Sequence, residues 1–316
     1  MWKYTTKEIL RLQIEIGNYC NLECPSCARK SNRRLPLDTD WMSLSFIEKH
    51  IRKTSLPNLI DISICGNIEE PTINPEIESI IEYFCSNWPD ADISISSNAS
   101  TRNEKFWNRL GQISANHPKF QVVFAIDGLE DTNHLYRVGS SWEKILRNIR
   151  AYLSNPGAVA IWQFVEMPHN SHQIESVKEF AKSEGFKNVW LRTSGRVTKE
   201  SVINVYTKKY HSQNETIVCR AQTKVRTNAP SIFVNYLGDV VPCCWLDPVN
   251  VSNYKAMIPW IEDCGGVLAY NLNYLPIEEI IEGEFFSIIQ DNMNSNSVCN
   301  RSCRTNAVDH ISPVEL

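Results

Sequence analysis

Short apolar segments alternate with longer amphipathic segments between residue 12 and about residue 192. The apolar segments are rich in β-branched and aromatic residues, which is typical of strands covered on both faces. We expect six strands, at Leu12–Gly17, Leu59–Cys65, Asp92–Ser97, Gln121–Asp127, Val159–Glu166 and Asn188–Arg192. We expect helices between them, at Ser43–Arg52, Pro75–Ser86, Asn103–Ile113, Trp142–Leu153 and Gln173–Glu184.

This alternation predicts the fold class. Strand–helix–strand units joined by right-handed crossovers build a parallel sheet whose faces are covered by the helices. Ser43 is a suitable N-cap residue for the first of these helices, and Gly185 is a suitable C-cap residue for the last. The pattern therefore predicts an α/β fold in which six parallel strands curl into a partial (β/α)6 barrel.

The alternation stops after residue 192, where the chain becomes polar and irregular. A hairpin is predicted at Ser231–Tyr236 and Asp239–Cys243, because two apolar runs flank a Leu-Gly turn. A further helix is predicted at Ile277–Ile289. We therefore divide the chain into a barrel, residues 1–200, and a small C-terminal hairpin-plus-helix domain, residues 201–316.

The composition excludes several classes of protein. The 316 residues carry 32 Lys and Arg against 36 Asp and Glu, a net charge of -4, so we expect no nucleic acid or membrane partner. No apolar run approaches the roughly 18 residues that a membrane span needs. The first residues lack the apolar core of a secretory signal. These features predict a soluble, cytoplasmic protein.

Eleven cysteines are unusual in a long chain without an export signal, and they favour metal or redox chemistry over disulfides. Cys20, Cys24 and Cys27 form a C-x3-C-x2-C loop directly after the first predicted strand. Three thiolates can bind three irons of a 4Fe–4S cluster and leave the fourth iron open for a substrate. Zinc is the alternative, although a structural zinc site needs a fourth ligand.

A C-x3-C-x2-C loop after the first strand of a partial barrel resembles the radical S-adenosylmethionine (SAM) superfamily. The resemblance implies a 4Fe–4S cluster on Cys20, Cys24 and Cys27 whose open iron binds the amino and carboxylate groups of SAM. It also implies that SAM is cleaved to methionine and a 5′-deoxyadenosyl radical, which takes a hydrogen atom from the substrate. A flavodoxin or ferredoxin is the implied electron donor.

The ends of the following strands extend this resemblance. Residues 65–71 (CGNIEEP), 96–100 (SSNAS) and 125–129 (AIDGL) occur in the order of the superfamily's SAM-binding segments. Active sites in such barrels gather at the C-terminal ends of the strands. The resemblance therefore implies that ten residues bind SAM: Gly66, Asn67, Glu69, Glu70, Ser97, Asn98, Asp127, Arg137, Gln163 and Arg192.

A second group of cysteines lies in the C-terminal part of the chain. A cysteine on a hairpin followed by a late cysteine pair resembles the auxiliary-cluster domains of the superfamily, called SPASM with two clusters and twitch with one. The resemblance implies a second 4Fe–4S cluster held by four residues: Cys219, Cys243, Cys299 and Cys303. Cys244 competes with Cys243 as the hairpin ligand, Cys264 is a further candidate, and a four-cysteine zinc site is the alternative.

We favour the oxidation of a small molecule, assisted by the second cluster. Only 11 residues precede the first predicted strand, which leaves no room for the N-terminal recognition domain of many peptide maturases. The first alternative is a maturase that modifies a ribosomal peptide or a protein side chain, and the second is a non-catalytic zinc-binding protein. No catalytic side chain is assigned, and the candidate substrate contacts are Trp162, Gln163, Glu166 and Arg192. Trp162 is equally a candidate core residue, and Gln163 and Arg192 are alternatively SAM contacts.

The substitution Cys303→Ala should remove one ligand of the second cluster. We expect the iron content after anaerobic reconstitution to fall by about one 4Fe–4S cluster, because each cluster needs its own set of thiolates. The first site should be unaffected. Iron and acid-labile sulfide analysis measures this change, and an unchanged iron count would exclude Cys303 as a required ligand.

Overall fold

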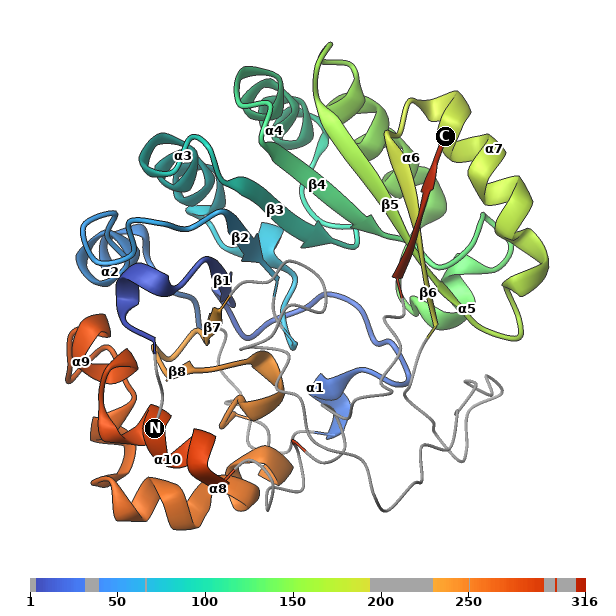
Figure 1. Ribbon diagram of the computed structural model, residues 1–316. Helices are drawn as coiled ribbons and strands as arrows, with labels where there is room; N and C mark the ends of the chain where they lie inside the picture. Colours follow the sequence, from blue (N-terminus) through green and yellow to red (C-terminus); the bar gives the residue numbers. More distant parts are fainter. Residues whose placement is uncertain are drawn as a thin grey trace.

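One nine-stranded sheet runs through the part of the chain that the structure describes, in the order β8-β7-β1-β2-β3-β4-β5-β6-β9 (Figure 1). The structure is a computed structural model, and it describes residues 4–31, 40–65, 67–193, 230–249, 251–292, 299 and 311–316. The strands are β1 (Arg11–Ile14), β2 (Asp61–Ile64), β3 (Asp92–Ser97), β4 (Phe120–Ala125), β5 (Val159–Glu166), β6 (Asn188–Thr193), β7 (Ser231–Val234), β8 (Val240–Val241) and β9 (Ile311–Glu315).

Strands β1 to β6 lie side by side in chain order, and each is parallel to the next. β3 and β5 have the predicted bounds, and the other four strands differ from the prediction by a few residues at an end. Along β1 and β2, buried side chains alternate with half-buried ones. Successive side chains of a strand point to opposite faces, so the buried set faces the helices and the other set faces the concave side. This arrangement confirms the predicted α/β partial barrel.

Helices cover the outer face of the curved sheet (Figure 1). They begin where short polar side chains cap them: Ser43 Oγ accepts from the Phe46 N–H at 3.2 Å, and Asn103 Oδ1 accepts from the Phe106 N–H at 3.1 Å. In the described ranges no helix is long and apolar enough to cross a membrane. The helices of this layer are α2 (Leu44–His50), α3 (Ile77–Asn87), α4 (Glu104–Asn116), α6 (Trp142–Leu153) and α7 (Ile174–Glu184).

The predicted hairpin joins the barrel sheet. β7 is parallel to β1, with Leu12 opposite Ile232 and Ile14 opposite Val234, and β8 is antiparallel to β7. Apolar side chains of β7 and β8 belong to the same hydrophobic core cluster as those of β1. The hairpin therefore extends the sheet beyond its first strand. The division at residue 200 stays a prediction, because residues 194–229 lie outside the described part of the chain.

The C-terminal helices differ from the prediction in two ways. The helix expected at Ile277–Ile289 is two helices, α9 (Ile277–Ile281) and α10 (Glu284–Asn292). The helix α8 (Val251–Asp263) is not predicted by the pattern, because Pro259 lies inside it and proline ordinarily ends a helix. Apolar residues of all three helices pack into the main core cluster.

The last strand, β9, is also missed by the sequence pattern. It lies antiparallel to β6 and covers that edge of the parallel sheet (Figure 1). Its five residues include Pro313 and stand at the end of a polar tail, so they carry little strand signal. Proline is tolerated in an edge strand, where one side of the backbone has no strand to bond.

Trp162 belongs to the core, which decides between the two roles expected for it and excludes it as a substrate contact. Its side chain is fully buried, and its indole N–H donates to the Ile126 carbonyl at 2.9 Å. Its ring lies 5.2 Å from that of Phe186 and 6.1 Å from that of Phe180. It is therefore on the helix side of β5, opposite the concave side.

The substitution Trp162→Ala should lower the free energy of unfolding by about 3–5 kcal/mol, because it leaves a large cavity in a packed core. The matched control is Trp41→Ala, since Trp41 is 43% exposed. Urea unfolding followed by circular dichroism measures both variants. Similar losses for the two tryptophans would contradict the core assignment of Trp162.

Candidate functional site

A cysteine-bearing loop connects the C-terminal end of β1 with the short helix α1 (Ala28–Ser31). The Glu70 N–H, after β2, donates to the Tyr19 carbonyl at 2.9 Å. The Arg29 guanidinium donates to the Cys20 carbonyl at 2.9 Å and lies over the Tyr19 ring at 5.1 Å. The backbone of the loop is therefore held from both sides at the mouth of the barrel.

Cys20, Cys24 and Cys27 lie close enough for their charges to interact, and none of them is in a disulfide. Burial, with a smaller effect from the Glu70 carboxyl, raises the pKa of the Cys20 thiol to about 12. Burial also raises the pKa of Cys24, whereas the Arg137 guanidinium lowers it. The Cys20 and Cys24 thiols therefore keep their protons at neutral pH, and metal binding releases these protons.

The donor set of this loop fits an iron–sulfur cluster. It offers three sulfur ligands, and thiolates are the protein ligands of 4Fe–4S clusters. Within the described ranges, no three His, Cys, Asp or Glu side chains are arranged as a ready metal site. The fit therefore rests on the chemistry of the donor set, three cysteine sulfurs from one loop.

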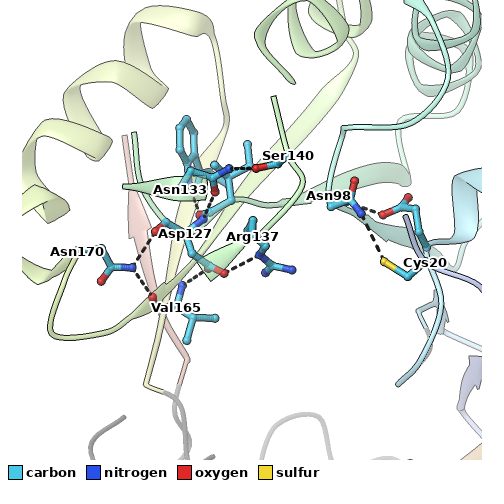
Figure 2. A network of polar contacts seen from close by, with 11 residues as sticks. Cys20, Asn98, Asp127, Asn133, Arg137, Ser140, Val165 and Asn170 are labelled. Atoms are coloured by element: carbon cyan, nitrogen blue, oxygen red, sulfur yellow. Dashed lines mark hydrogen bonds and ion pairs between the residues drawn. The ribbon is translucent and has the colours of Figure 1, made fainter. Parts of the chain in front are cut away.

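Asn98, in the turn after β3, contacts the first of these thiols (Figure 2). Its Nδ2 donates to Cys20 Sγ at 3.7 Å and to Asn21 Oδ1 at 3.0 Å. Its Oδ1 accepts from the backbone N–H and the hydroxyl of Ser100, at 2.9 Å and 2.6 Å. The structure thus brings a predicted SAM contact to a predicted cluster ligand.

Glu70 links the loop after β2 to the end of β3. One carboxylate oxygen accepts from the hydroxyls of Thr72 and Ser97, each at 2.6 Å, and the other accepts from the Asn98 N–H at 2.7 Å. Burial raises the pKa of Glu70, and these hydrogen bonds oppose the rise. Two predicted SAM contacts, Glu70 and Ser97, are therefore bonded to each other and position Asn98.

Asp127 and Arg137 form a buried ion pair at the end of β4 (Figure 2). Arg137 Nε donates to Asp127 Oδ2 at 2.7 Å, and the Val165 N–H donates to Asp127 Oδ1 at 2.8 Å. Burial lowers the pKa of Arg137, but the Asp127 carboxylate more than offsets this, so the net shift is upward. The guanidinium stays charged and also faces the Cys24 thiol.

A glycine is required directly after Asp127. Gly128 has φ +154°, and a Cβ at this position would lie 2.0 Å from Thr132 Oγ1. The Thr132 hydroxyl and the Leu129 N–H both donate to Gln173 Oε1. This close packing fixes the loop that leads to α5 (Asn133–Tyr136), and Arg137 follows α5 directly.

Three carboxyl groups lie on the β1 side of the mouth, where Glu15 and Asp247 are buried and Glu69 is half-buried. Glu15 accepts from the Ile68 N–H at 3.0 Å, and Glu69 accepts from the Ile16 N–H at 2.9 Å. Burial raises the pKa values of both well above the usual range, and Asp247 adds to the shift of Glu15. Burial also raises the pKa of Asp247, to about 6. These groups hold protons at a higher pH than ordinary carboxyls do.

The other predicted SAM contacts lie farther from the thiols or outside the described residues. Asn67 Nδ2 donates to the Cys244 carbonyl at 3.3 Å, which links the loop after β2 to the hairpin. Gln163 in β5 and Arg192 in β6 are half-buried. Gly66 is the contact that the structure does not describe. The SAM-binding roles of these residues stay predictions.

Cys243 and Cys244 follow β8, and Cys244 begins the short helix η4 (Cys244–Leu246). Burial, with a smaller effect from the nearby Cys65, raises the pKa of the Cys244 thiol to about 12. Cys244 therefore lies near the end of β2, where Cys65 follows the strand. The choice of Cys243 over Cys244 as the hairpin ligand of a second cluster stays a prediction.

The remaining distal cysteines are only partly described. The Cys264 thiol donates to the Ile261 carbonyl at 3.5 Å, at the end of α8. Cys299 is buried in the main core cluster. Cys219 and Cys303 lie outside the described residues. The second cluster therefore stays a prediction.

Sequence reasoning missed three polar residues of the site. Asn21 lies within the cysteine loop, and Ser100 closes the turn that begins at Asn98, so their positions beside predicted site residues are the available signal. Glu15 interrupts the apolar run between Ile14 and Ile16. An acid at a buried strand position is rare without a partner, so it marks a buried polar site.

A partial parallel barrel with three thiols at the end of its first strand defines a class of SAM-dependent radical enzymes. The sequence model of the Radical SAM superfamily matches residues 14–180, more than half of the chain. The chain belongs to this superfamily. Membership implies SAM and a 4Fe–4S cluster as cofactors. No curated protein matches the sequence.

Several solved structures share the fold. SuiB of Streptococcus suis bound to S-adenosylmethionine matches with a TM-score of 0.58 and 16% identity, over 77% of this chain and 62% of that chain. The structure of anSMEcpe with bound AdoMet and Cp18Cys peptide matches with a TM-score of 0.55 and 15% identity, over 88% of this chain and 81% of that chain. BtrN in complex with AdoMet and 2-DOIA matches with a TM-score of 0.52 and 13% identity, over 99% of this chain and 100% of that chain. This chain thus spans less than two thirds of SuiB, and these low identities show the fold alone.

The substitution Asp247→Asn should stabilise the protein at alkaline pH. The pKa of Asp247 is about 6 in the folded state and near 3.8 when unfolded, so its contribution is most favourable at low pH and is lost as pH rises through 6. A difference of about two pKa units between the folded and unfolded states changes the free energy of unfolding by about 3 kcal/mol. About half of this change is already present at pH 5, so we expect the stability of the variant relative to the wild type to rise by roughly 1–2 kcal/mol between pH 5 and pH 8.

Urea unfolding of the variant and the wild type at both pH values measures this difference. Asp92→Asn is the matched control, because the Asp92 side chain is exposed and pairs with Lys119 at the surface. It should change the free energy of unfolding by less than about 1 kcal/mol at either pH. An Asp247→Asn effect that is the same at pH 5 and pH 8 would contradict the assigned shift.

Proposed function

We propose that the protein reductively cleaves SAM and uses the resulting 5′-deoxyadenosyl radical to take a hydrogen atom from a small, polar substrate. The observation that carries this proposal is the thiol loop at the C-terminal end of β1, with Cys20, Cys24 and Cys27 close together. Cys20, Cys24 and Cys27 would hold a 4Fe–4S cluster, and this group would supply the electron that cleaves SAM. Three ligands leave one iron for SAM itself.

Arg137 is the residue best placed to bind the SAM carboxylate. Its Nε is bonded to Asp127, and its guanidinium faces Cys24, beside the proposed cluster. A planar guanidinium suits a carboxylate, because it donates two parallel hydrogen bonds. Asp127 keeps this cation in place and charged. Arg137 would therefore hold the methionine end of SAM next to the open iron.

The concave side of the sheet carries polar groups, which supports a polar substrate. Ser63 and Ser94 are hydrogen bonded through their hydroxyls at 3.1 Å, and Gln13 Nε2 donates to the Cys65 carbonyl at 3.0 Å. The half-buried Gln163 lies on the same side. Amide and hydroxyl groups bind substrate hydroxyls and amines by hydrogen bonds.

The solved structures that share the fold include complexes with a small molecule and with peptides, so the small-molecule proposal is supported by the polar concave side and not by the matches. BtrN, whose complex contains 2-DOIA, matches over nearly the whole of both chains. SuiB, which has been solved with the precursor peptide SuiA, is covered over only 61% of its length in that complex. Peptide modification remains the second candidate, since anSMEcpe also binds a peptide and is covered over 81%.

We further propose that the net reaction is a two-electron oxidation. Hydrogen abstraction leaves a substrate radical, which must lose one electron to become a closed-shell product. A second 4Fe–4S cluster would supply the electron acceptor, and four residues would hold it: Cys219, Cys243, Cys299 and Cys303. Flavodoxin or ferredoxin is the proposed donor for the first cluster.

The substitution Cys24→Ala should abolish SAM cleavage, because it removes one of three cluster ligands. The measurement is 5′-deoxyadenosine release under anaerobic, reducing conditions. Cys85→Ala is the matched control: Cys85 is buried in α3, away from the loop, and should reduce stability but keep cleavage. Deoxyadenosine release by Cys24→Ala at the wild-type rate would contradict the proposal.

A further inference from the structure

Three polar side chains beside the first cluster cysteine form a closed ring of hydrogen bonds. Asn98 Nδ2 donates to Asn21 Oδ1 at 3.0 Å, and Asn21 Nδ2 donates to Ser100 Oγ at 2.9 Å. The Ser100 hydroxyl donates to Asn98 Oδ1 at 2.6 Å and completes the ring. Every member donates once and accepts once, so each fixes the orientation of the next.

The Asn98 amide has one orientation that satisfies its neighbours. Its Oδ1 also accepts from the Ser100 backbone N–H at 2.9 Å, so a flipped amide would place two donors against each other. One Nδ2 hydrogen is used by Asn21. The other hydrogen is directed to Cys20 Sγ, 3.7 Å from the nitrogen (Figure 2).

The backbone of this turn is strained, and its neighbours hold it. Ala99 has φ +59°, in the left-handed region that costs free energy for any residue with a Cβ. Asn148 Nδ2 donates to the Ala99 carbonyl at 2.7 Å, and the Ala99 N–H donates to Ser97 Oγ at 3.1 Å. Strain that the surroundings maintain is concentrated at functional sites. Here it presents the Asn98 side chain to the cysteine loop.

The charge near Cys20 bears on the reduction potential of a cluster bound there, and so does the hydrogen bond from Asn98. The Glu70 carboxyl lies near the Cys20 thiol and disfavours negative charge on it. Net charge nearby and hydrogen bonds to the sulfurs both set the reduction potential of an iron–sulfur cluster. A carboxylate lowers that potential, and an N–H donor to sulfur raises it. Asn98 therefore opposes the effect of Glu70.

We propose that Asn98 is a positioning residue that donates a hydrogen bond to the Cys20 thiolate and thereby raises the reduction potential of the cluster bound by the cysteine loop. The proposal rests on the proposed function, because it requires that cluster. This role differs from direct SAM binding, since it operates when SAM is absent. It makes the cluster easier for a protein electron donor to reduce.

The test is an EPR-monitored redox titration of the anaerobically reconstituted full-length protein without SAM. The comparison is made at the potential where the wild-type cluster is half reduced. There, Asn98→Ala should raise the ratio of oxidised to reduced cluster by about threefold to tenfold. A tenfold change corresponds to about 59 mV for a one-electron couple. Asn98→Asp should shift the ratio further in the same direction, because it replaces the donor with a carboxylate. Ala99→Gly keeps Asn98 and relieves the turn, so it should titrate like the wild type.

The outcomes separate the two proposals. A midpoint unchanged in both Asn98 variants would overturn the inference, and so would a shift that appears only after SAM is added, which would make Asn98 a SAM contact. A wild-type protein that takes up no 4Fe–4S cluster would instead overturn the proposed function. A shift in SAM-free Asn98 variants with Ala99→Gly unchanged supports the inference.

Pulsed EPR on the wild-type protein tests the contact without a substitution. Asparagine labelled with ¹⁵N at the side-chain amide is incorporated, and the cluster is reduced without SAM. We expect a ¹⁵N coupling to the cluster, because the Asn98 amide is bonded to a ligand sulfur. Absence of any such coupling in the wild type would overturn the inference even if the Asn98 variants fail to fold.

Discussion

Three thiols must be held at one place on the rim of the barrel while one side stays open to the concave face of the sheet. The rest of the site depends on this constraint. Parallel strands meet it because their C-terminal ends lie at one edge. Each neighbouring strand end contributes one contact to the cysteine loop. After β2, the Glu70 N–H bonds the backbone of the cysteine loop at Tyr19. After β3, the Asn98 side chain donates to Cys20 Sγ. Beyond β4, the Arg137 guanidinium lies near the Cys24 thiol.

The two polar groups that approach the thiols differ in charge, and this difference suits two tasks. Arg137 is a cation fixed by the buried carboxylate of Asp127, so it can hold an anionic group of SAM. Asn98 is neutral and fully constrained by Asn21 and Ser100, so it can act on a ligand sulfur without adding a charge. Binding and redox tuning can thus be assigned to different residues, Arg137 near Cys24 and Asn98 at Cys20.

Elements that arise from repeating local patterns were predictable from the sequence. The bounds of β3, β5 and α6 match because each is a short apolar or amphipathic run between polar residues. The pairing of β7 with β1 was not predictable, because strand pairing across more than 200 residues leaves no local signal. Likewise the motif order located Asn98, but only the turn at Ala99 and the ring with Asn21 show that it contacts Cys20.

The central claim is that the three cysteines hold a 4Fe–4S cluster with one iron free for SAM. EPR spectra of the reduced, anaerobically reconstituted protein, recorded before and after addition of SAM, test it most directly. The account predicts a 4Fe–4S signal whose g-values shift when SAM is added, because SAM ligates the free iron. A signal that SAM leaves unchanged, or a zinc-bearing protein without labile sulfide, would contradict it.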